Sequence, residues 1–474
     1  MKRSLRFGTD GWRGVIADDF TFANLRRVSQ AAAEVFLEKG GSAPPKVSVG
    51  YDTRFLSPQF ARVAAEVLAA NGIQVRLSNS HLTTPALSWD VVNARQDWGI
   101  MLTASHNPPR FNGFKIKTRE GASADDSITR LVEERANSPD LSITPLNAEP
   151  TIAEVDMVAP YLERVSSLVE WERIGMMVSH VISDPLYGAV QNRLLTLLEE
   201  HSSIPARGIH TTLNPVFGGL DPEPIPRNLK GLVEEVVRSA SPTLGIAQDG
   251  DGDRLGMVDE EGNWVSPHQV LSLLLIYLAK EKGLRGQVVK SFSTTMLVEH
   301  ICQDLGLECV ETGIGFKYIA PHMISKPTLI AGEESGGVAF GFHIPERDGI
   351  LAGLMVLEML GTWGITLKDA VKRMERRYGP YLYKRIDLTM PVEKGRRIVD
   401  TLEASPPERL GNLKVVEVRR KDGVKLVLQG GAWLLVRASG TEPLLRLYAE
   451  APRPKELERI LDDGNKACRA ALSR

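Results

Sequence analysis

The sequence predicts an α/β fold in which three similar α/β domains and a C-terminal α+β domain are arranged around a central cleft. Over most of the 474 residues, short apolar runs alternate with helical patterns, which is typical of strands connected by helices. Four apolar runs also end in a polar loop that contains Gly or Pro. A chain of this length is too long for one hydrophobic core, and usual domain sizes suggest about three or four domains.

The N-terminal part shows the alternation most clearly. Lys46–Tyr51 and Ile73–Ser78 are expected to be strands, and between them Ser57-Pro58 favours the start of a helix with one apolar face. The Pro- and Gly-rich stretch Asn214–Arg227 is expected to be a loop. Further strands are expected at Met176–Ser183, Gln287–Lys290 and Thr328–Ala331.

The pattern changes after Gly379-Pro380, where strands follow one another without intervening helices before a final helix. This change favours a small α+β domain. The strands are expected at Leu413–Val418, Val424–Leu428, Trp433–Arg437 and Leu444–Ala449. We therefore predict domains at residues 1–150, 151–255, 256–378 and 379–474.

Composition excludes several classes of protein. The net charge of -2 shows no basic excess, which argues against nucleic-acid binding. The three cysteines include no C-x-x-C pair, which argues against a disulfide framework or a thiolate metal site. No secretory signal is visible, and the longest apolar run, Val270–Leu278, is far shorter than the ~20 residues of a membrane span. A cytoplasmic location without a membrane partner is expected.

The four polar loops each follow a predicted strand. They are Thr103–Pro108, Asp249–Arg254, Gly332–Gly337 and Arg437–Pro443. In α/β domains, ligands bind outside the carboxyl ends of strands. One such loop in each predicted domain therefore suggests that all four face a shared site.

The second loop predicts a metal site. Asp249, Asp251 and Asp253 alternate with other residues, so in an extended chain their side chains point the same way. Carboxylates this close would repel, and an all-oxygen ligand set suits Mg²⁺ or Ca²⁺. A calcium-binding EF-hand is the sharper alternative because Glu260 stands at position 12, but Arg254 replaces the required Gly at position 6 and the flanks resemble strands.

The other loops suggest phosphate and sugar chemistry. Ser105 lies in no G-x-S-x-G motif, and the adjacent His106 is expected to point away from it, so a phosphate-carrying serine fits better than a hydrolase nucleophile. A Gly-containing turn with Arg, as in Arg437–Thr441, can bind an anion through backbone N–H groups, and Arg446 could add a second fork. Glu333 and Ser335 suit a ligand with adjacent hydroxyls.

Together, these loops and their order resemble the α-D-phosphohexomutase family over essentially the whole chain. The opening Phe7–Gly14 and the segment Asn112–Lys115 resemble it as well. The resemblance implies a soluble isomerase that acts on small hexose phosphates, is a monomer or homodimer, and has a mobile C-terminal lid. It also implies Mg²⁺ as cofactor and glucose 1,6-bisphosphate as activator.

The resemblance also implies roles for individual residues. Ser105 would be the phosphoserine, and Asp249, Asp251 and Asp253 would hold Mg²⁺ together with its phosphate. The basic residues beside the transferring group would be Arg13, Lys115 and Arg254. Of these, Lys115 would be the general acid/base. Other residues would bind substrate. Glu333 and Ser335 would bind sugar hydroxyls, and the non-reacting phosphate would be bound by Arg437, Ser439, Gly440 and Thr441. Further contacts with substrate would come from Lys290, Lys317 and Arg446.

The implied reaction interconverts hexose 1-phosphate and hexose 6-phosphate through a bisphosphate. Gly337 stands where the mannose/glucose and glucosamine branches usually carry His, and Glu334 where the glucosamine branch tends to carry Gln. Phosphoglucomutase is therefore favoured, phosphomannomutase is the alternative, and phosphoglucosamine mutase fits less well. A metal-dependent sugar phosphatase and a non-catalytic sugar-phosphate sensor are alternatives of a different class.

Overall fold

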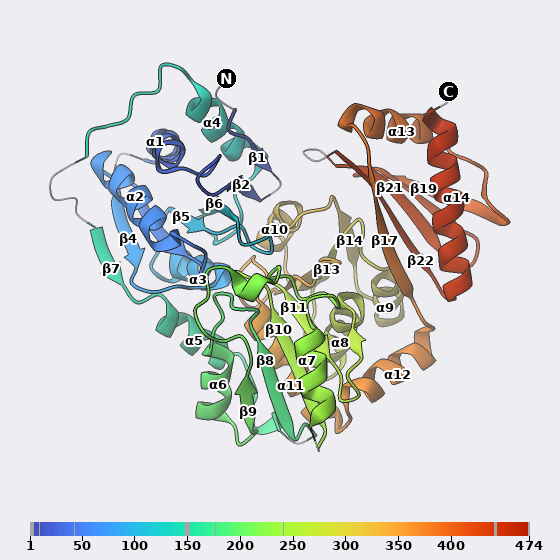
Figure 1. Cartoon of the computed structure of the whole chain (residues 1–474). Coiled ribbons are helices and arrows are strands. Elements are labelled where there is room, and N and C mark those ends of the chain that lie inside the picture. The colour runs from blue at the N-terminus through green and yellow to red at the C-terminus, as the bar shows by residue number, and fades with distance from the viewer. Residues whose placement is uncertain are drawn as a thin grey trace. The chain divides into compact units, whose positions relative to one another are not determined.

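The computed structural model describes residues 4–8, 10–41, 43–146, 152–175, 177–239, 241–439 and 443–472. Contacts divide the chain into two compact units, which Figure 1 shows in a single cartoon. The larger unit comprises Met1–Gly286 and Gly315–Ala370, and the smaller comprises Gln287–Ile314 and Val371–Arg474. The predicted third domain, residues 256–378, contributes to both units, and the four domain boundaries stay a prediction.

The first sheet of the larger unit has seven strands in the order β1-β2-β6-β5-β3-β4-β7. The strands are β1 (Phe7–Gly8), β2 (Gly11–Val15), β3 (Lys46–Tyr51), β4 (Gln74–Ser78), β5 (Trp98–Leu102), β6 (Phe111–Thr118) and β7 (Ile152–Val155). β3 runs parallel to β4 and β5, whereas β6 runs antiparallel to both β5 and β2. The prediction for β3 is confirmed to the residue, and β4 begins one residue later than predicted.

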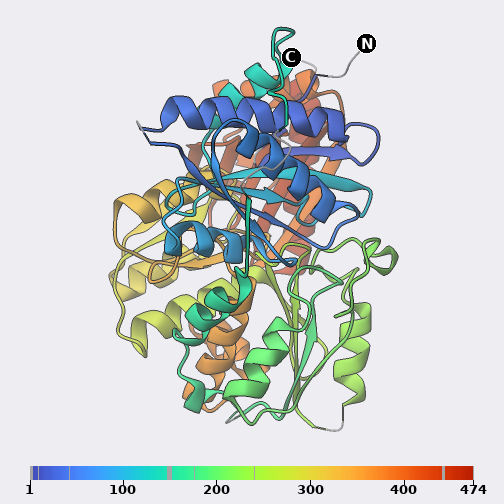
Figure 2. The same cartoon turned by 90° about the vertical axis from the view of Figure 1, so that its left-hand side faces the viewer.

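Helices cover both faces of this sheet. They are α1 (Phe22–Lys39), α2 (Ser57–Ala70), α3 (Thr84–Asn93) and α4 (Asp126–Asn137). Val47 and Val49 of β3 belong to the core that α1, α2 and α4 share, whereas Ser48 donates a 2.6 Å hydrogen bond to Asp90 of α3. Successive strand residues point to opposite faces, so α3 lies on the other face. Figure 2 shows the dark-blue α1 and the lighter blue α3 on opposite sides of the strands.

The second sheet of the larger unit has the order β12-β11-β10-β8-β9. Its elements are α5 (Val158–Ser166), β8 (His180–Asp184), α6 (Arg193–His201), β9 (Ala206–Gly208), α7 (Lys230–Arg238), β10 (Thr243–Gln248), β11 (Leu255–Val258) and β12 (Trp264–Val265), with short 3₁₀ helices at Trp171–Arg173 and Phe217–Gly219. β10 is parallel to β8 and forms an antiparallel hairpin with β11. The prediction for β8 is wrong at its start, because the strand begins at His180; Met176 lies outside the described residues.

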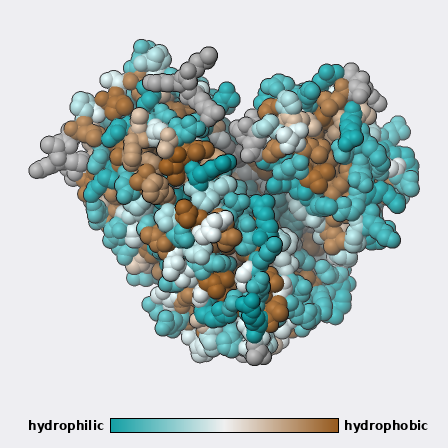
Figure 3. All heavy atoms as spheres, viewed as in Figure 1, coloured by the Kyte–Doolittle hydropathy of each residue, from teal (hydrophilic) through white to brown (hydrophobic). Residues whose placement is uncertain are grey.

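The rest of the larger unit holds a strand pair and further helices. These are α8 (Pro267–Lys280), α10 (Phe316–Ser325), β15 (Thr328–Gly332) with antiparallel β16 (Val338–Phe340), and α11 (Gly349–Trp363). Among the described residues no single helix could cross a membrane; α11 and α12 (Leu367–Tyr378) meet the length and composition criteria only when joined. On the side shown in Figure 3, hydrophobic residues lie in small groups among hydrophilic ones.

The smaller unit contains a parallel strand pair and an antiparallel sheet. β13 (Gln287–Ser291) pairs with β14 (Cys309–Thr312), and α9 (Leu297–Leu305) connects them. The six-stranded sheet comprises β17 (Leu382–Thr389), β22 (Leu444–Ala451), β21 (Trp433–Ala438), β20 (Val424–Leu428), β19 (Leu413–Arg420) and β18 (Arg409–Leu410), in that order. Residues of α13 (Val392–Ala404) and α14 (Pro454–Leu472) share a hydrophobic core with these strands. The predicted fold class, α/β domains followed by an α+β domain, is confirmed.

Candidate active site

Ser105 lies in a tight, buried turn just after β5. Its backbone is left-handed, with φ 52°, and its side chain is almost fully buried. Its backbone N–H donates to Thr103 Oγ1 at 2.9 Å, which fixes the turn. The hydroxyl is 3.1 Å from Asp249 Oδ2 and 3.4 Å from His106 Nδ1. The expectation that His106 points away from Ser105 is therefore wrong, because the left-handed turn brings neighbouring side chains together.

Arg54, which sequence reasoning missed, holds this turn in place. The fully buried guanidinium donates to the carbonyl oxygens of Ser105 and Asn107 at 2.6 Å, and to those of Pro108 and Phe111 at 3.0 Å. Its Nε pairs with Asp52 at 3.1 Å. The five N–H groups of an Arg fork match such a set of acceptors. The sequence does contain a signal for Arg54, because Asp52 and Arg54 come just after β3. This strand is the parallel neighbour of β5, which leads into the Ser105 turn.

We expect Arg54→Met to destabilise the fold strongly, because it removes the positive charge that pairs with the buried Asp52 and the guanidinium that donates to four carbonyl oxygens. Removing one partner of a buried ion pair costs about 3–5 kcal/mol. Arg62→Met is the matched control: Arg62 pairs with Glu154, both side chains are about half exposed, and we expect a loss below about 1 kcal/mol. Urea unfolding of both variants measures the difference. Equal midpoints would contradict the structural role of Arg54.

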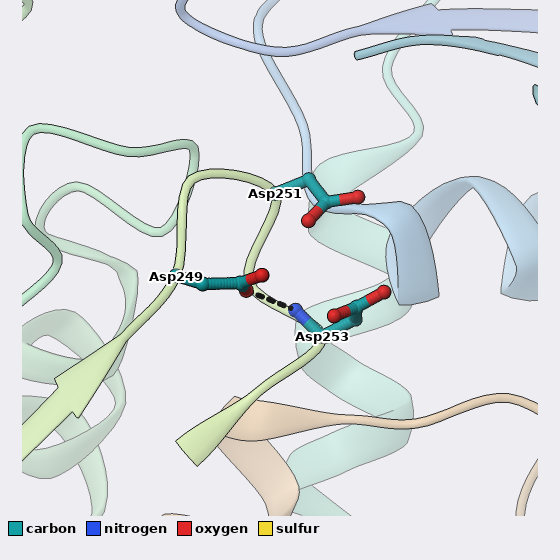
Figure 4. A group of neighbouring side chains, drawn as sticks. All are labelled: Asp249, Asp251 and Asp253. Carbon is teal, nitrogen blue, oxygen red and sulfur yellow. Dashed lines mark hydrogen bonds between the residues drawn. The ribbon is translucent and has the colours of Figure 1, made fainter. Parts of the chain in front are cut away.

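The acidic loop joins β10 to β11. Figure 4 shows the carboxylates of Asp249, Asp251 and Asp253 directed toward a common space, and one oxygen of each lies within 4.8 Å of the others. The glycines between them are required for different reasons. A Cβ on Gly250 would lie 2.5 Å from the carbonyl oxygen of Ser105, whereas Gly252 has φ +72°. The loop therefore packs directly against the Ser105 turn.

Each carboxylate of the acidic loop has its own partners. Asp249 Oδ1 accepts the backbone N–H groups of Asp253 and Arg254, at 3.0 and 3.1 Å. Asp251 Oδ2 accepts from Thr84 Oγ1 at 2.6 Å and from Lys115 Nζ at 2.9 Å. Among the described residues, Asp251 Oδ1 and Asp253 Oδ1 are buried without a hydrogen-bond donor. These two oxygens are therefore available to a cation.

The electrostatics of the loop also fit a divalent cation. Burial, and then the Asp253 and Asp251 carboxylates, raise the pKa of Asp249 well above its ordinary value. Burial also raises the pKa of Asp253. For Asp251 burial acts the same way but is outweighed by Lys115 and the hydrogen bond from Thr84, so its pKa is lowered. Two buried carboxyls that resist ionisation, and unpaired oxygens beside them, suit a hard cation with oxygen ligands.

The EF-hand alternative is excluded by the structure. The acidic loop connects two antiparallel strands rather than two helices. Glu260, the candidate ligand at position 12, instead accepts the backbone N–H groups of Leu367 and Lys368 at 2.8 and 3.3 Å. It therefore binds the N-terminal turn of α12.

The predicted basic residues surround the acidic loop. Lys115 of β6 is buried, and its Nζ lies 2.7 Å from Asp10 and 3.7 Å from Asp253, in addition to its contact with Asp251. Burial would lower the pKa of Lys115, but these carboxylates raise it, so the group is an ammonium. Arg254 Nε lies 3.8 Å from Asp249. Arg13 donates to the side chain of Asn107, in the Ser105 turn.

The Glu333 loop adjoins the acidic loop. The two segments form an antiparallel bridge between Arg254 and Gly337. Glu333 is buried, and burial raises its pKa to about 7 although Arg347 opposes the shift. Ser335 is half-buried in the turn that follows. Arg347, which sequence reasoning missed, lies between the loops: Nη1 donates to Glu333 at 3.2 Å, and Nη2 is 2.6 Å from Asp253.

The other predicted substrate residues lie elsewhere. Lys317 is in the larger unit, where its Nζ is 2.6 Å from Asp126. Lys290 is fully buried in the smaller unit, 2.8 Å from Glu299 and 3.0 Å from Glu311. These carboxylates already pair its ammonium, and its predicted contact with substrate stays a prediction.

The predicted phosphate loop belongs to the smaller unit. Arg437 Nε lies 2.8 Å from Asp422, and Arg437 stands opposite Arg446 in the pairing of β21 with β22. The backbone N–H of Ser439 donates to Leu444 at 2.9 Å, which closes a hairpin. Gly440 and Thr441 lie outside the described residues.

Comparison with known protein families gives four domain matches in chain order. All four describe phosphoglucomutase/phosphomannomutase. Domain I matches residues 4–142, domain II residues 159–262, domain III residues 266–378, and the C-terminal domain residues 392–466.

Individual relatives match over nearly their whole length. A phosphoglucomutase/phosphomannomutase of Thermococcus kodakarensis is 29% identical over 98% of this chain and 99% of its own. A phosphoglucosamine mutase of Caldicellulosiruptor bescii is also 29% identical, over 96% of each chain. A crystal structure from Thermus thermophilus, provisionally named a phosphomannomutase, is 34% identical with a TM-score of 0.86, covering 98% of this chain and 99% of the other.

Proposed function

The chain belongs to the phosphoglucomutase/phosphomannomutase family and is an intramolecular phosphotransferase, and on this premise we propose that it interconverts glucose 1-phosphate and glucose 6-phosphate with Ser105 as phosphoryl carrier. The observation that supports this most is the 3.1 Å contact between Ser105 Oγ and Asp249, in a buried site with two more carboxylates. A phosphate on Ser105 would complete an oxygen ligand set at that point.

Asp249, Asp251 and Asp253 would hold Mg²⁺ together with the phosphate on Ser105. When bound, Mg²⁺ would neutralise charge on the phosphate oxygens. Asp251 is already positioned by Thr84, whose backbone N–H donates to the Asp251 carbonyl oxygen at 2.9 Å. The positive charges of Lys115, Arg254 and Arg13 stand around the same point and would stabilise the transferring group.

In the proposed reaction, the phosphoryl group of phospho-Ser105 passes to the free hydroxyl of the hexose phosphate. The serine Oγ–P bond breaks, a bond from the hydroxyl oxygen to phosphorus forms, and one proton moves from that hydroxyl to the serine oxygen. The product is a hexose 1,6-bisphosphate. After the bisphosphate reorients, its other phosphoryl group returns to Ser105 by the reverse steps. The same bisphosphate would serve as activator of dephosphorylated enzyme.

The remaining candidate residues would bind the rest of the substrate. Glu333 and Ser335 would bind sugar hydroxyls. A partly ionised carboxyl in a buried site is a strong hydrogen-bond partner for hydroxyls. The non-reacting phosphate would be bound by residues of the smaller unit: Arg437, Ser439, Gly440, Thr441 and Arg446. Lys290 and Lys317 are weaker candidates for substrate contact.

Glucose is the proposed sugar because Gly337 departs from the His expected of the mannose/glucose and glucosamine branches, and Glu334 departs from the Gln expected of the glucosamine branch. We expect kcat/KM for glucose 1-phosphate to exceed that for mannose 1-phosphate, and both to exceed that for glucosamine 1-phosphate. Steady-state rates on the three substrates measure the order. A higher kcat/KM for mannose 1-phosphate would favour phosphomannomutase. Release of inorganic phosphate in place of a sugar phosphate product would refute the mutase assignment.

A further inference from the structure

Arg347 is the buried cation that joins the acidic loop to the Glu333 loop. Each nitrogen of its guanidinium contacts a different carboxylate. Nη2 lies 2.6 Å from Asp253 Oδ2, Nη1 donates to Glu333 Oε2 at 3.2 Å, and Nε donates to Glu346 Oε1 at 3.1 Å. The Cζ atom of Arg347 lies over the ring of Phe316, 5.2 Å from the ring centroid. Since the fork is planar and engaged on all sides, its orientation fixes those carboxylates relative to one another.

The chain on both sides of Arg347 is anchored by buried contacts. Glu346 pairs with Lys117, and both side chains are fully buried. Asp348 caps α11 by accepting the backbone N–H of Leu351 at 2.9 Å, and the hydroxyl of Tyr161 donates to the same carboxylate at 2.9 Å. The fold therefore sets the position of Arg347 independently of any ligand.

Gly337 provides the space that Arg347 fills. A Cβ at this position would lie 2.2 Å from Arg347 Cδ and 2.8 Å from its Cγ. Gly337 is not among the residues with positive φ, so its backbone would accept an L-residue. The close approach of the arginine, and not the backbone conformation, is what requires glycine here. A single methyl group at residue 337 must displace the Arg347 side chain.

We infer that Arg347 is a positioning residue that holds the Glu333 carboxylate where sugar hydroxyls would bind, ties that carboxylate to the metal ligand Asp253, and depends on Gly337 for its space. The inference rests on the proposed function, which gives Glu333 and Asp253 their roles. Two consequences of opposite sign follow. Loss of the fork should weaken sugar binding, whereas loss of its positive charge beside Asp253 should strengthen cation binding.

The test measures KM for glucose 1-phosphate, and Mn²⁺ affinity by electron paramagnetic resonance without sugar. In Arg347→Met we expect KM to rise about tenfold or more, and Mn²⁺ to bind roughly tenfold more tightly. Arg347→Lys keeps the charge but not the fork, so it should restore the wild-type Mn²⁺ affinity while KM stays raised. If Arg347 had only a structural role, its substitution would raise KM, weaken Mn²⁺ binding and lower the melting temperature together.

Gly337→Ala tests the same inference without changing a charged group. We expect it to raise KM as Arg347→Met does, and the double variant to be no worse than either single variant. Gly41→Ala is the matched control, because a Cβ at Gly41 would meet no atom within 4 Å. An unchanged KM in Arg347→Met, or weaker Mn²⁺ binding in it, would overturn the inference while wild-type mutase activity leaves the proposed function standing. A wild-type protein without mutase activity would overturn both.

Discussion

Ser105→Ala is expected to reduce kcat for glucose 1-phosphate by at least about a thousandfold, the scale seen when a covalent nucleophile is removed. The substitution deletes the hydroxyl that lies 3.1 Å from Asp249 and would carry the phosphoryl group. It leaves the fold intact, because the backbone N–H of residue 105 still donates to Thr103 and Arg54 still binds the carbonyl oxygen. Steady-state rates and a melting curve measure both effects.

Ser325→Ala controls for the loss of a serine hydroxyl as such. Ser325 is exposed at the end of α10, where its Oγ is 3.3 Å from the carbonyl oxygen of His322, and we expect unchanged rates. A Ser105→Ala enzyme with more than a tenth of wild-type kcat would show that another group carries the phosphoryl.

Asp251→Asn is expected to lower Mg²⁺ affinity by more than about a hundredfold, since loss of even a supporting partner of a metal ligand costs ten- to a hundredfold. The pKa of Asp251 is lowered, so the wild-type residue is a carboxylate at neutral pH, and the amide removes that charge. Chelation of wild-type enzyme should likewise abolish turnover, and Mg²⁺ should restore it. Ca²⁺ should restore much less because its geometry is looser.

The control for Asp251→Asn is Asp462→Asn, which removes a carboxylate from an exposed position on α14. It should bind Mg²⁺ as the wild type does. Full activity of the wild-type protein in excess EDTA would contradict the metal assignment, and so would an Asp251→Asn variant that titrates with Mg²⁺ at the wild-type concentration.

The strands that could be predicted from sequence are those in which apolar side chains line one face. β3 and β20 match the prediction to the residue for this reason, with Val47, Val49 and Tyr51 alternating along β3 and Val424, Leu426 and Leu428 along β20. β6 was not predicted, since its inward positions include Lys115 and Lys117, whose carboxylate partners Asp251 and Glu346 lie on distant segments. A hydrophobic pattern cannot identify a strand whose buried positions are charged.

The candidate site shows the same limit. The loops themselves could be found because each groups its polar residues after an apolar run. Two of their supports could not, because Thr84 and Arg347 act through residues far away in the chain. Arg347 in particular has no motif of its own, and its importance follows from Asp253, Glu333 and Gly337 meeting around it.

Phosphoryl transfer to Ser105 is the most direct test of the account. Enzyme stripped of phosphate should be nearly inactive on glucose 1-phosphate, and a trace of labelled glucose 1,6-bisphosphate should both start turnover and place the label on the peptide that contains Ser105. Activation that coincides with label on Ser105 is the predicted result. Turnover that begins with no label on that peptide, or with label on another residue, would contradict it.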